Sequence, residues 1–381
     1  MPRVLILSAA PGVPLYGPSG SSAHLRGVAR AFRTMGWDAH LAVPRLADHR
    51  GAVHDPLQIP VTTCPPRRWG WMPRRFRERG ERRDGARLMS RAVADFGLPD
   101  LLYERHSLFC DAGARLARRN CVPRIVELNA PQATERARWE TLRDPPFAHR
   151  MERVVLQSAD RVVAVSAHLA AWAIEEAGCQ RDRVRHVPNG TVGGRAGDRE
   201  GTRTRLGLEG LVVGFLGSLK PWHGVERIPA ILDALPEATA LVIGAGPVPI
   251  PAHPRILFAG RAEPAEVPDL VSAMDVGIAP YPVGTGPWFC PLKLLEYRAQ
   301  GIPAVATDLG DCATLLRDGA GEVLSTDDPL AWAAAIRRQS RAARVPRTRA
   351  WTQVTREAVE GWETLVQRYT SDVALQRRKP A

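Results

Sequence analysis

The feature that most constrains the fold of this chain is an alternation of strand-like and helix-like segments that runs twice along the sequence. Short apolar runs typical of buried strands occupy residues 3–9, 38–44, 101–104, 124–128, 161–165 and 184–187, and segments with apolar residues at helical spacing lie between them. The alternation restarts at Leu211, after residues 191–210, which are rich in glycine and arginine and lack apolar periodicity. Such a pattern predicts parallel sheets covered by helices.

The length of the chain indicates two domains, because 381 residues exceed what one hydrophobic core usually organises. We predict an N-terminal Rossmann-like domain over 1–190, a linker over 191–210 and a second Rossmann-like domain over 211–345. The last helical segment, within 346–381, is predicted to cross back to the N-terminal domain and to end in a frayed tail. The fold class is α/β, with two doubly wound parallel sheets that face a cleft, where ligands are expected.

Composition excludes several classes of protein. No apolar run approaches the roughly 20 residues of a membrane-spanning helix, and the N-terminus resembles a buried first strand more than a signal peptide. The six cysteines are far apart, which argues against zinc and disulfides. We therefore expect a cytoplasmic protein with reduced cysteines and no metal.

The formal charge of +12 is unevenly distributed. Residues 67–91 contain ten arginines and three acids, a local charge of +7, so one segment carries most of the excess and a nucleic-acid partner is not expected. Two interpretations stay open. The segment is either a basic flap, with Trp69, Trp71, Met72 and Phe76, that contacts anionic lipid at the inner membrane face or an acidic acceptor, or a solvated loop and helix.

Two glycine-containing loops follow predicted strands and are candidates for anion binding. Residues 12–22 join the first strand to the first helix and include Gly20; their pattern is neither a dinucleotide fingerprint nor a P-loop. In the second half, Gly217 and Ser218 end a strand and precede Lys220 and His223. An ammonium group there suits a diphosphate leaving group. The alternatives are a solvent-exposed Lys220 and a His223 that packs or caps a helix.

A third candidate segment is the helix that begins near Pro291. Glu296 lies inside it and can accept two hydroxyl hydrogen bonds from a ribose; the alternative is a surface glutamate paired with Lys293 at i, i+3 spacing. The chain contains no Asp-x-Asp pair of the kind that holds a divalent metal on a diphosphate. The phosphate charge would then be met by Lys220, helix dipoles and backbone N–H groups, which predicts metal independence.

The order and spacing of several segments resemble the retaining glycosyltransferases of family four, which have the GT-B fold. The segments are LYGPSGSSAHLRGVARAF, YERHSLFCDAG, IVELNAP and ADRVVAVSAHLAAWAIEEAG with VPNG in the first half, and GFLGSLKPWHGVE, MDVGIAPYP and PLKLLEYRAQGIPAVATDLG in the second. The likeness spans almost the whole chain. It implies transfer of a sugar from a nucleotide-diphosphate donor to a hydroxylated acceptor, without a cofactor or a protein nucleophile.

The resemblance also implies roles for residues at matching positions. Lys220 corresponds to the diphosphate-binding basic residue, Glu296 to the second acid of the E-x7-E motif, which holds the ribose, and the Gly20 loop to the segment that closes on the donor phosphates. The predicted catalytic residues are Lys220, Glu296 and Asn129. The predicted donor-binding residues are Gly20, Gly217, Ser218, Lys220, His223, Phe289, Cys290, Pro291, Leu292 and Glu296. The acceptor-side candidates are His24, Arg105, His106, Glu127 and Asn129.

Three positions depart from the family pattern. Trp288 stands where the first acid of E-x7-E would fall, so backbone N–H groups of 289–292 are expected to contact the donor sugar instead. His223 replaces a second lysine, which would make phosphate binding depend on pH. Asn129 stands where many members have a histidine near the reacting carbon, and we expect it to orient hydroxyl groups.

The identity of the substrates stays open at this point. The family as a whole favours a uridine over a guanosine diphosphate sugar, and the acceptor could be a cell-surface glycan, a lipid-linked molecule or a secondary metabolite. Two other functions are compatible with the same fold: a nucleotide-sugar epimerase or hydrolase, and a catalytically silent binding protein. The sequence does not predict the oligomeric state.

Overall fold

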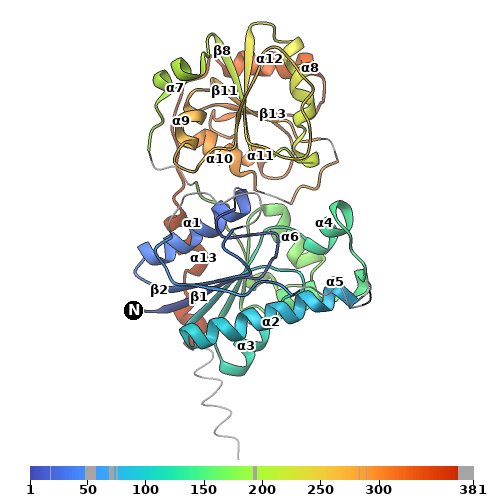
Figure 1. Ribbon diagram of the computed structural model, residues 1–381, viewed down its shortest axis with the longest axis vertical. Coiled ribbons are helices and arrows are strands. Elements are labelled where there is room, and N and C mark those ends of the chain that lie inside the picture. The colour runs from blue at the N-terminus through green and yellow to red at the C-terminus, as the bar shows by residue number, and fades with distance from the viewer. Residues whose placement is uncertain are drawn as a thin grey trace, which may run out of the picture.

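The computed structural model describes residues 1–17, 19–47, 57–67, 73, 76–191, 195–282, 284–288 and 290–367. These residues form two α/β domains, one above the other in Figure 1, and each domain is built around one parallel sheet. The predicted fold class is confirmed.

The N-terminal sheet has seven parallel strands in the described part of the chain, in the order β3-β2-β1-β4-β5-β6-β7. The strands are β1 (Arg3–Ser8), β2 (Asp38–Val43), β3 (Val61–Thr63), β4 (Leu101–Arg105), β5 (Arg124–Leu128), β6 (Arg161–Ala164) and β7 (Val184–His186). The helices are α1 (Gly20–Thr34), α2 (Arg77–Phe96), α3 (Ala112–Asn120), α4 (Gln132–Trp139), α5 (Pro145–Gln157) and α6 (Ala167–Glu175), with a 3-10 turn η2 (Arg181–Arg183) before β7.

The first strand shows how the sequence sets the layers of this domain. Successive side chains of a strand point to opposite faces of the sheet. Val4 and Ile6 therefore pack with α1 and the C-terminal helix α13 (Trp351–Val359), whereas Leu5 and Leu7 pack with α2 and α3. All four side chains are fully buried, which is why the strand is a continuous apolar run and not an alternating one.

The C-terminal sheet has six parallel strands in the described part of the chain, in the order β10-β9-β8-β11-β12-β13. The strands are β8 (Leu211–Leu216), β9 (Ala238–Ile243), β10 (Ile256–Gly260), β11 (Val276–Ala279), β12 (Ala304–Thr307) and β13 (Gly321–Leu324). The helices are α7 (Arg199–Leu206), α8 (Ile228–Asp233), α9 (Val267–Ser272), α10 (Leu292–Ala299), α11 (Cys312–Leu315) and α12 (Pro329–Gln339), with 3-10 turns η3 (Pro221–His223) and η4 (Val225–Arg227) before α8.

The strand order of this second sheet reverses between β8 and β11, and Tyr297 of α10 fills the place where these strands separate. Its hydroxyl accepts a hydrogen bond from the N–H of Leu216 at 2.9 Å and lies 3.2 Å from the carbonyl oxygen of Ile278. A Cβ on Gly277 would lie 2.4 Å from the Tyr297 ring, so only glycine leaves room for it. Tyr297 therefore fixes α10 against the switch point of the sheet, where open α/β sheets bind ligands.

The two domains are held together by α13 and by a shared core. In α13, Trp351 contacts α1: its ring lies 4.6 Å from the ring of His24, and a Cβ on Gly27 would clash with it. A single buried cluster also includes Leu169 of α6 in the first domain and Leu294 of α10 in the second. The helices α1 and α6 consequently face α10 and α11 across the domain boundary (Figure 1).

Several elements were not predicted from the sequence. Residues 191–210 were expected to be a linker, and no helix was predicted in them, but they contain α7. This helix has a single buried residue and is attached through arginines: Arg199 and Arg203 donate hydrogen bonds to Asp275 at 2.6 and 3.2 Å. Apolar periodicity could not reveal such a helix. The short strand β3 and the polar helix α4 were also missed.

The described part of the arginine-rich segment is mostly the helix α2. Arg82 donates to Asp111 at 2.6 Å, and Glu81 accepts from Arg136 of α4 at 2.6 Å, so part of the charge is paired within the domain. The interpretation of 67–91 as a loop and helix fits these residues. The predicted flap residues Trp69, Trp71 and Met72 lie outside the described residues, and contact of this segment with lipid stays a prediction.

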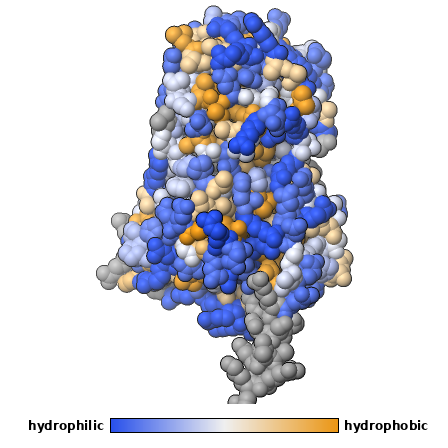
Figure 2. Space-filling model, turned by 180° about the vertical axis from the view of Figure 1, so that it is seen from behind, coloured by the Kyte–Doolittle hydropathy of each residue, from blue (hydrophilic) through white to orange (hydrophobic). Residues whose placement is uncertain are grey.

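The surface of the described residues is largely hydrophilic on the face drawn in Figure 2, where apolar residues gather in small groups. None of the helices in the described ranges has the length and hydropathy that a membrane span requires.

Candidate functional site

The carboxyl ends of the two sheets meet at the domain boundary, and the candidate residues lie around this meeting point. Gly20, the first residue of α1, approaches α10 so closely that a Cβ on it would lie 3.1 Å from Cδ1 of Leu292. Ser166 at the start of α6 donates a hydrogen bond to the carbonyl oxygen of Trp288 at 2.6 Å. The structure therefore brings the predicted Gly20 loop and the predicted donor helix together.

The loop after β8 is closely packed against its neighbours. The N–H of Gly217 donates to the carbonyl oxygen of Ile243 at 2.9 Å, and the N–H of Leu219 donates to Ala245 at 3.2 Å. A Cβ on Gly244 would clash with the carbonyl oxygen of Gly217, so the two loops can touch only through glycine. Because the Gly217 N–H is already bonded, it is not available to a donor phosphate.

His223 lies within this loop and is uncharged at neutral pH. Its Nδ1 is hydrogen-bonded to the carbonyl oxygen of Ser218, which fixes the proton on Nδ1. Burial, together with the nearby Lys293 and Lys220, lowers the pKa of His223 to about 3. In the unliganded protein His223 therefore supplies no positive charge near pH 7.

Lys220 and Glu296 lie on different elements of the second domain, Lys220 in the loop after β8 and Glu296 on α10. The Nζ of Lys220 lies 5.6 Å from the ring centroid of Trp222, and Trp222 contacts Trp139 of the first domain at 5.0 Å between ring centroids. Glu296 is half-buried on α10. The structure thus places Lys220 beside an aromatic contact between the domains, and Glu296 on the helix whose N-terminus faces Gly20.

Lys293 is a candidate that the sequence analysis missed as a site residue. It was considered only as a surface partner of Glu296, but it is 7% exposed, and its Nζ has no hydrogen-bond partner among the described residues. The same helix face carries the fully buried Tyr297 four residues later, so a lysine at position 293 lies on the core-facing stripe. That spacing was the available signal.

Glu127 is one of the five acceptor-side candidates, and three of the other four converge on its carboxylate. Its Oε1 lies 2.8 Å from Nε2 of His24, 2.7 Å from Nδ2 of Asn129 and 3.2 Å from Nη1 of Arg105. Its Oε2 accepts from the hydroxyl of Tyr103 at 2.7 Å. Burial alone would raise the pKa of Glu127, but His24, Arg105 and Asn129 lower it to about 2. Glu127 is therefore an ionised group whose hydrogen-bonding capacity is taken by its neighbours.

The roles within this carboxylate cluster follow from exposure. Glu127 and His24 are buried, whereas Asn129 is partly exposed. Asn129 is consequently the member best placed to touch a ligand, and Glu127 orients its amide. Tyr103 was not predicted, although it lies two residues before Arg105 and so on the same face of β4.

His106, the fifth candidate, is separated from this cluster. It follows Arg105 and faces the other side of the sheet, where it is fully buried near Arg124. Burial and the charge of Arg124 lower its pKa to about 3. The structure does not bring His106 into the Glu127 cluster.

Trp288, which stands in place of the first acid of E-x7-E, and its neighbours contribute to contact between the domains. The Trp288 carbonyl is bonded to Ser166, and the ring leaves room only for glycine at position 286. The Cys290 thiol is buried beside Asn189, and burial raises its pKa to about 12. Phe289 lies outside the described residues. Cys290 is therefore packed in the interface, and Leu292 is the predicted donor-side residue that the structure places against Gly20.

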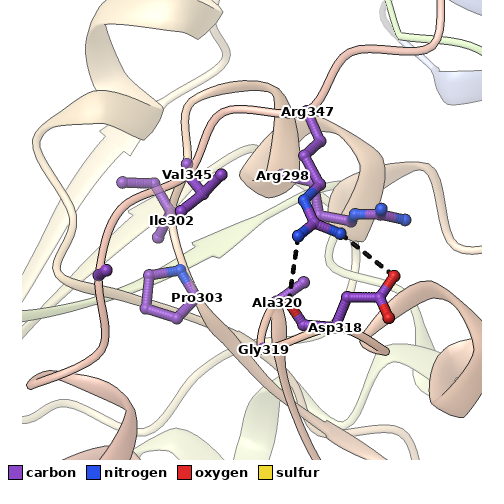
Figure 3. Close-up of a pocket in the computed structure, with 10 residues that line it drawn as sticks. Arg298, Ile302, Pro303, Asp318, Gly319, Ala320, Val345 and Arg347 are labelled. Atoms are coloured by element: carbon purple, nitrogen blue, oxygen red, sulfur yellow. Dashed lines mark hydrogen bonds and ion pairs between the residues drawn. The ribbon is translucent and has the colours of Figure 1, made fainter.

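A small pocket lies at the C-terminal end of α10, the end opposite to the one that contacts Gly20 (Figure 3). It has a volume of about 30 Å³ and is lined by Arg298, Gly301, Asp318 and Arg347, among others, with Arg347 bonded to Asp318 at 3.2 Å. This is room for about one or two water molecules, too small for a nucleotide. No group of three or more His, Cys, Asp or Glu side chains within the described ranges is arranged to hold a metal ion.

Comparison with known families agrees with the two-domain arrangement. The family model described as Glycosyltransferase Family 4 matches residues 18–192, and the one described as Glycosyl transferases group 1 matches residues 210–341. The two models together cover most of the chain and each coincides with one domain.

Relatives of known name match over part of their length. The chain is 29% identical over 197 residues to TuaH of Bacillus subtilis, a protein named for teichuronic acid biosynthesis, with 48% of each chain covered. It is 28% identical over 281 residues to D-inositol 3-phosphate glycosyltransferase of Acidothermus cellulolyticus, covering 66% of this chain and 62% of that protein. The chain thus spans about half to three-fifths of the length of these relatives.

Solved structures confirm the fold. Sucrose-phosphate synthase from Thermosynechococcus elongatus superposes with a TM-score of 0.71 at 17% identity, over 99% of both chains. HepE from Anabaena, in complex with UDP and glucose, superposes with a TM-score of 0.66 at 18% identity, over 98% of this chain and 100% of that one. Both family models and this shared architecture lead to one conclusion: the chain belongs to the family-four glycosyltransferases and has their two-domain GT-B fold.

Proposed function

We propose that this chain is a retaining, metal-independent glycosyltransferase that moves a sugar from a nucleotide-diphosphate donor, with UDP favoured, to a hydroxyl group of an acceptor. The observation that carries the proposal is the meeting of Gly20 on α1 with Leu292 on α10, beside a lysine-bearing loop at the carboxyl end of β8. Helix N-termini and lysines at such a place suit a diphosphate. HepE from Anabaena, which shares this fold, is in complex with UDP, and this supports uridine.

In the proposed reaction, the bond between the sugar carbon and the diphosphate oxygen breaks as the bond to the acceptor oxygen forms on the same face. The proton of the acceptor hydroxyl goes to the departing phosphate oxygen, so the products are the glycoside and the nucleoside diphosphate. The protein's part is to stabilise the charge that grows on the diphosphate. Glu296 would hold the ribose through its two hydroxyl groups.

On the acceptor side, Asn129 would orient a hydroxyl group. Glu127 holds the Asn129 amide at 2.7 Å and is ionised, with a pKa of about 2, so it positions Asn129 and does not need to accept the acceptor's proton. Relatives named D-inositol 3-phosphate glycosyltransferases make an inositol phosphate one acceptor worth testing, beside lipid-linked sugars and secondary metabolites.

The test is a thermal-shift screen of the full chain with EDTA present, against UDP, GDP and their sugar derivatives. A ligand at 100 times its dissociation constant should add about 2.7 kcal/mol of stability. Stabilisation by UDP or a UDP-sugar in EDTA supports the proposal. Absence of any shift, or a shift that appears only when a divalent metal is added, contradicts it.

A second assay separates transfer from the other chemistries that this fold hosts. Release of UDP that depends on an added acceptor indicates a transferase. Release of UDP or free sugar without an acceptor would indicate a hydrolase, and interconversion of the UDP-sugar without UDP release would indicate an epimerase. Either of the last two results would overturn the proposed reaction.

A further inference from the structure

Lys293 is a buried cation without a hydrogen-bond partner in the described part of the chain. Its side chain is 7% exposed, and its Nζ lies 4.3 Å from the ring centroid of Phe215 and 4.8 Å from that of Tyr281. An ammonium ion has three N–H donors, and contact with ring faces replaces its lost hydration only in part. A buried, unpaired charge is costly, so the unliganded protein keeps an unfavourable group at this position.

The ammonium of Lys293 lies at the switch point of the second sheet. Phe215 belongs to β8, and Tyr281 follows β11, the two strands between which the order reverses. A Cβ on Gly217 would lie 3.5 Å from Cε and 3.8 Å from Nζ of Lys293. Gly217 has a φ of 142° and no side chain, so a ligand can come close to its backbone from the side that Lys293 faces.

Lys293 is also the second residue of α10, whose N-terminus has no side-chain cap. The N-cap residue, Pro291, has neither an N–H group nor a side chain that could cap the helix. The first N–H groups of an uncapped helix and its dipole attract negative charge. An anion in front of Gly217 would therefore meet both the helix N-terminus and the ammonium group.

The other predicted cations are less well placed. His223 is neutral, with Nδ1 bonded to the Ser218 carbonyl oxygen. Lys220 is half-exposed and lies over Trp222. Of the 52 lysines and arginines in the chain, only three are lysines, namely Lys220, Lys293 and Lys379. In a chain that otherwise uses arginine, two of its lysines lie around one loop.

We propose that Lys293 is the principal diphosphate-binding residue of this chain, with its ammonium group on the donor diphosphate in front of Gly217 at the N-terminus of α10. The assignment rests on the proposed function, because it takes the donor to be a nucleoside diphosphate. It shifts to Lys293 the main role that the family resemblance gave to Lys220.

A buried lysine differs from a buried arginine in that it can lose its proton. Burial lowers the pKa of Lys293 to about 7, so the empty site can lose the proton, which an arginine cannot do. The titratable groups that face Lys293 are His223 from the β8 loop, Tyr281 from the β11 loop and Cys312 of α11. All three are neutral between pH 7 and 8, since burial raises the pKa of Tyr281 and Cys312 and lowers that of His223. A bound diphosphate would restore the charge of Lys293, so UDP binding near pH 8 should take up a proton.

The experiment is calorimetric titration of UDP and UMP into the wild-type chain and into the variants Lys293→Met, Lys220→Met and Arg298→Met. It is done at pH 8 in two buffers of different ionisation enthalpy, so that the proton uptake on binding can be measured. Methionine keeps the length of the side chain without its charge, and Arg298 on the same helix is the matched control. We expect Lys293→Met to weaken UDP binding by about 10- to 100-fold, the range of a hydrogen bond to a charged group. Its preference for UDP over UMP and its proton uptake should also fall. Lys220→Met should lose less, and Arg298→Met should bind like the wild type.

The melting temperature of the free protein separates a binding role from a structural one. Because Lys293→Met removes a buried amino group that has no hydrogen-bond partner in the described part of the chain, its melting temperature should stay equal or rise while UDP binding weakens. A variant that melts earlier but binds UDP as the wild type does would show that Lys293 only packs against Phe215 and Tyr281, and would overturn the inference while the proposed function stands. Failure of the wild type to bind UDP or any other nucleotide would instead overturn the proposed function.

Discussion

Replacing Glu127 with glutamine tests the carboxylate cluster of the N-terminal domain. All four groups around this carboxylate can donate hydrogen bonds: His24, Asn129, Arg105 and Tyr103. Glutamine keeps the shape, but its amide has one acceptor oxygen and an NH2 group that must face a donor. We expect Glu127→Gln to destabilise the native state, and the size of the effect can be worked out from the pKa.

The pKa of Glu127 in the native state is about 2, against an ordinary value of 4.5. One pKa unit corresponds to about 1.4 kcal/mol, so the native surroundings favour the ionised form by about 3 kcal/mol. Because the native pKa is depressed, this stabilisation is present above pH 4.5 and is lost as the pH falls toward 2. At pH 3.5 about 1 kcal/mol of it should be gone.

The assay is urea unfolding of the wild type and Glu127→Gln at pH 7 and pH 3.5. We expect the free energy of unfolding to differ by about 3 kcal/mol at pH 7 and by about 1 kcal/mol less at pH 3.5. Glu200→Gln, at a carboxylate whose side chain is 91% exposed, is the control and should change stability by less than about 0.5 kcal/mol. An equal difference at both pH values would refute the conclusion that the cluster holds Glu127 ionised.

Two further substitutions test the packing of the two sheets. Gly277→Ala puts a methyl group 2.4 Å from the Tyr297 ring and should lower the free energy of unfolding in denaturant by about 1 to 3 kcal/mol. The control is Gly12→Ala, which should leave stability unchanged because no atom lies within 4 Å of the new Cβ. Equal effects of the two substitutions would contradict the fit of Tyr297 at the switch point. Glu104 is fully buried, and its Oε2 lies 2.8 Å from Arg124 Nε. Arg124→Met removes this partner and should lower the free energy of unfolding by about 3 to 5 kcal/mol, with Arg118→Met at an exposed arginine as the control. A loss below about 1 kcal/mol would show that the ion pair is not needed for stability.

Much of the fold could be predicted from the sequence because parallel strands that are buried on both faces are continuous apolar runs. The segments at Arg3, Leu211 and Ala304 are of this kind, and each forms the expected strand. Elements held by charge could not be found in the same way. In α7, arginines bonded to Asp275 take the place of an apolar face.

The site was predictable where it depends on order along the chain and less so where it depends on side-chain direction. Loops after parallel strands meet at one edge, which placed Gly20, Gly217 and Lys220 near the domain boundary. Direction separated His106 from Arg105, since neighbours on a strand point to opposite faces. Lys293 is a candidate because its side chain is buried. In the sequence, only its spacing from Tyr297 and the scarcity of lysine could have indicated that burial.

The central claim is that a nucleoside diphosphate binds at the carboxyl edge of the second sheet, between Gly217 and the N-terminus of α10. A crystal structure of the full chain with UDP, grown with EDTA, tests it most directly. We predict the diphosphate within hydrogen-bonding distance of Lys293 Nζ and in front of Gly217, with the ribose hydroxyls on Glu296. Density for UDP at another place, or a diphosphate held through a metal ion and away from α10, would contradict the account.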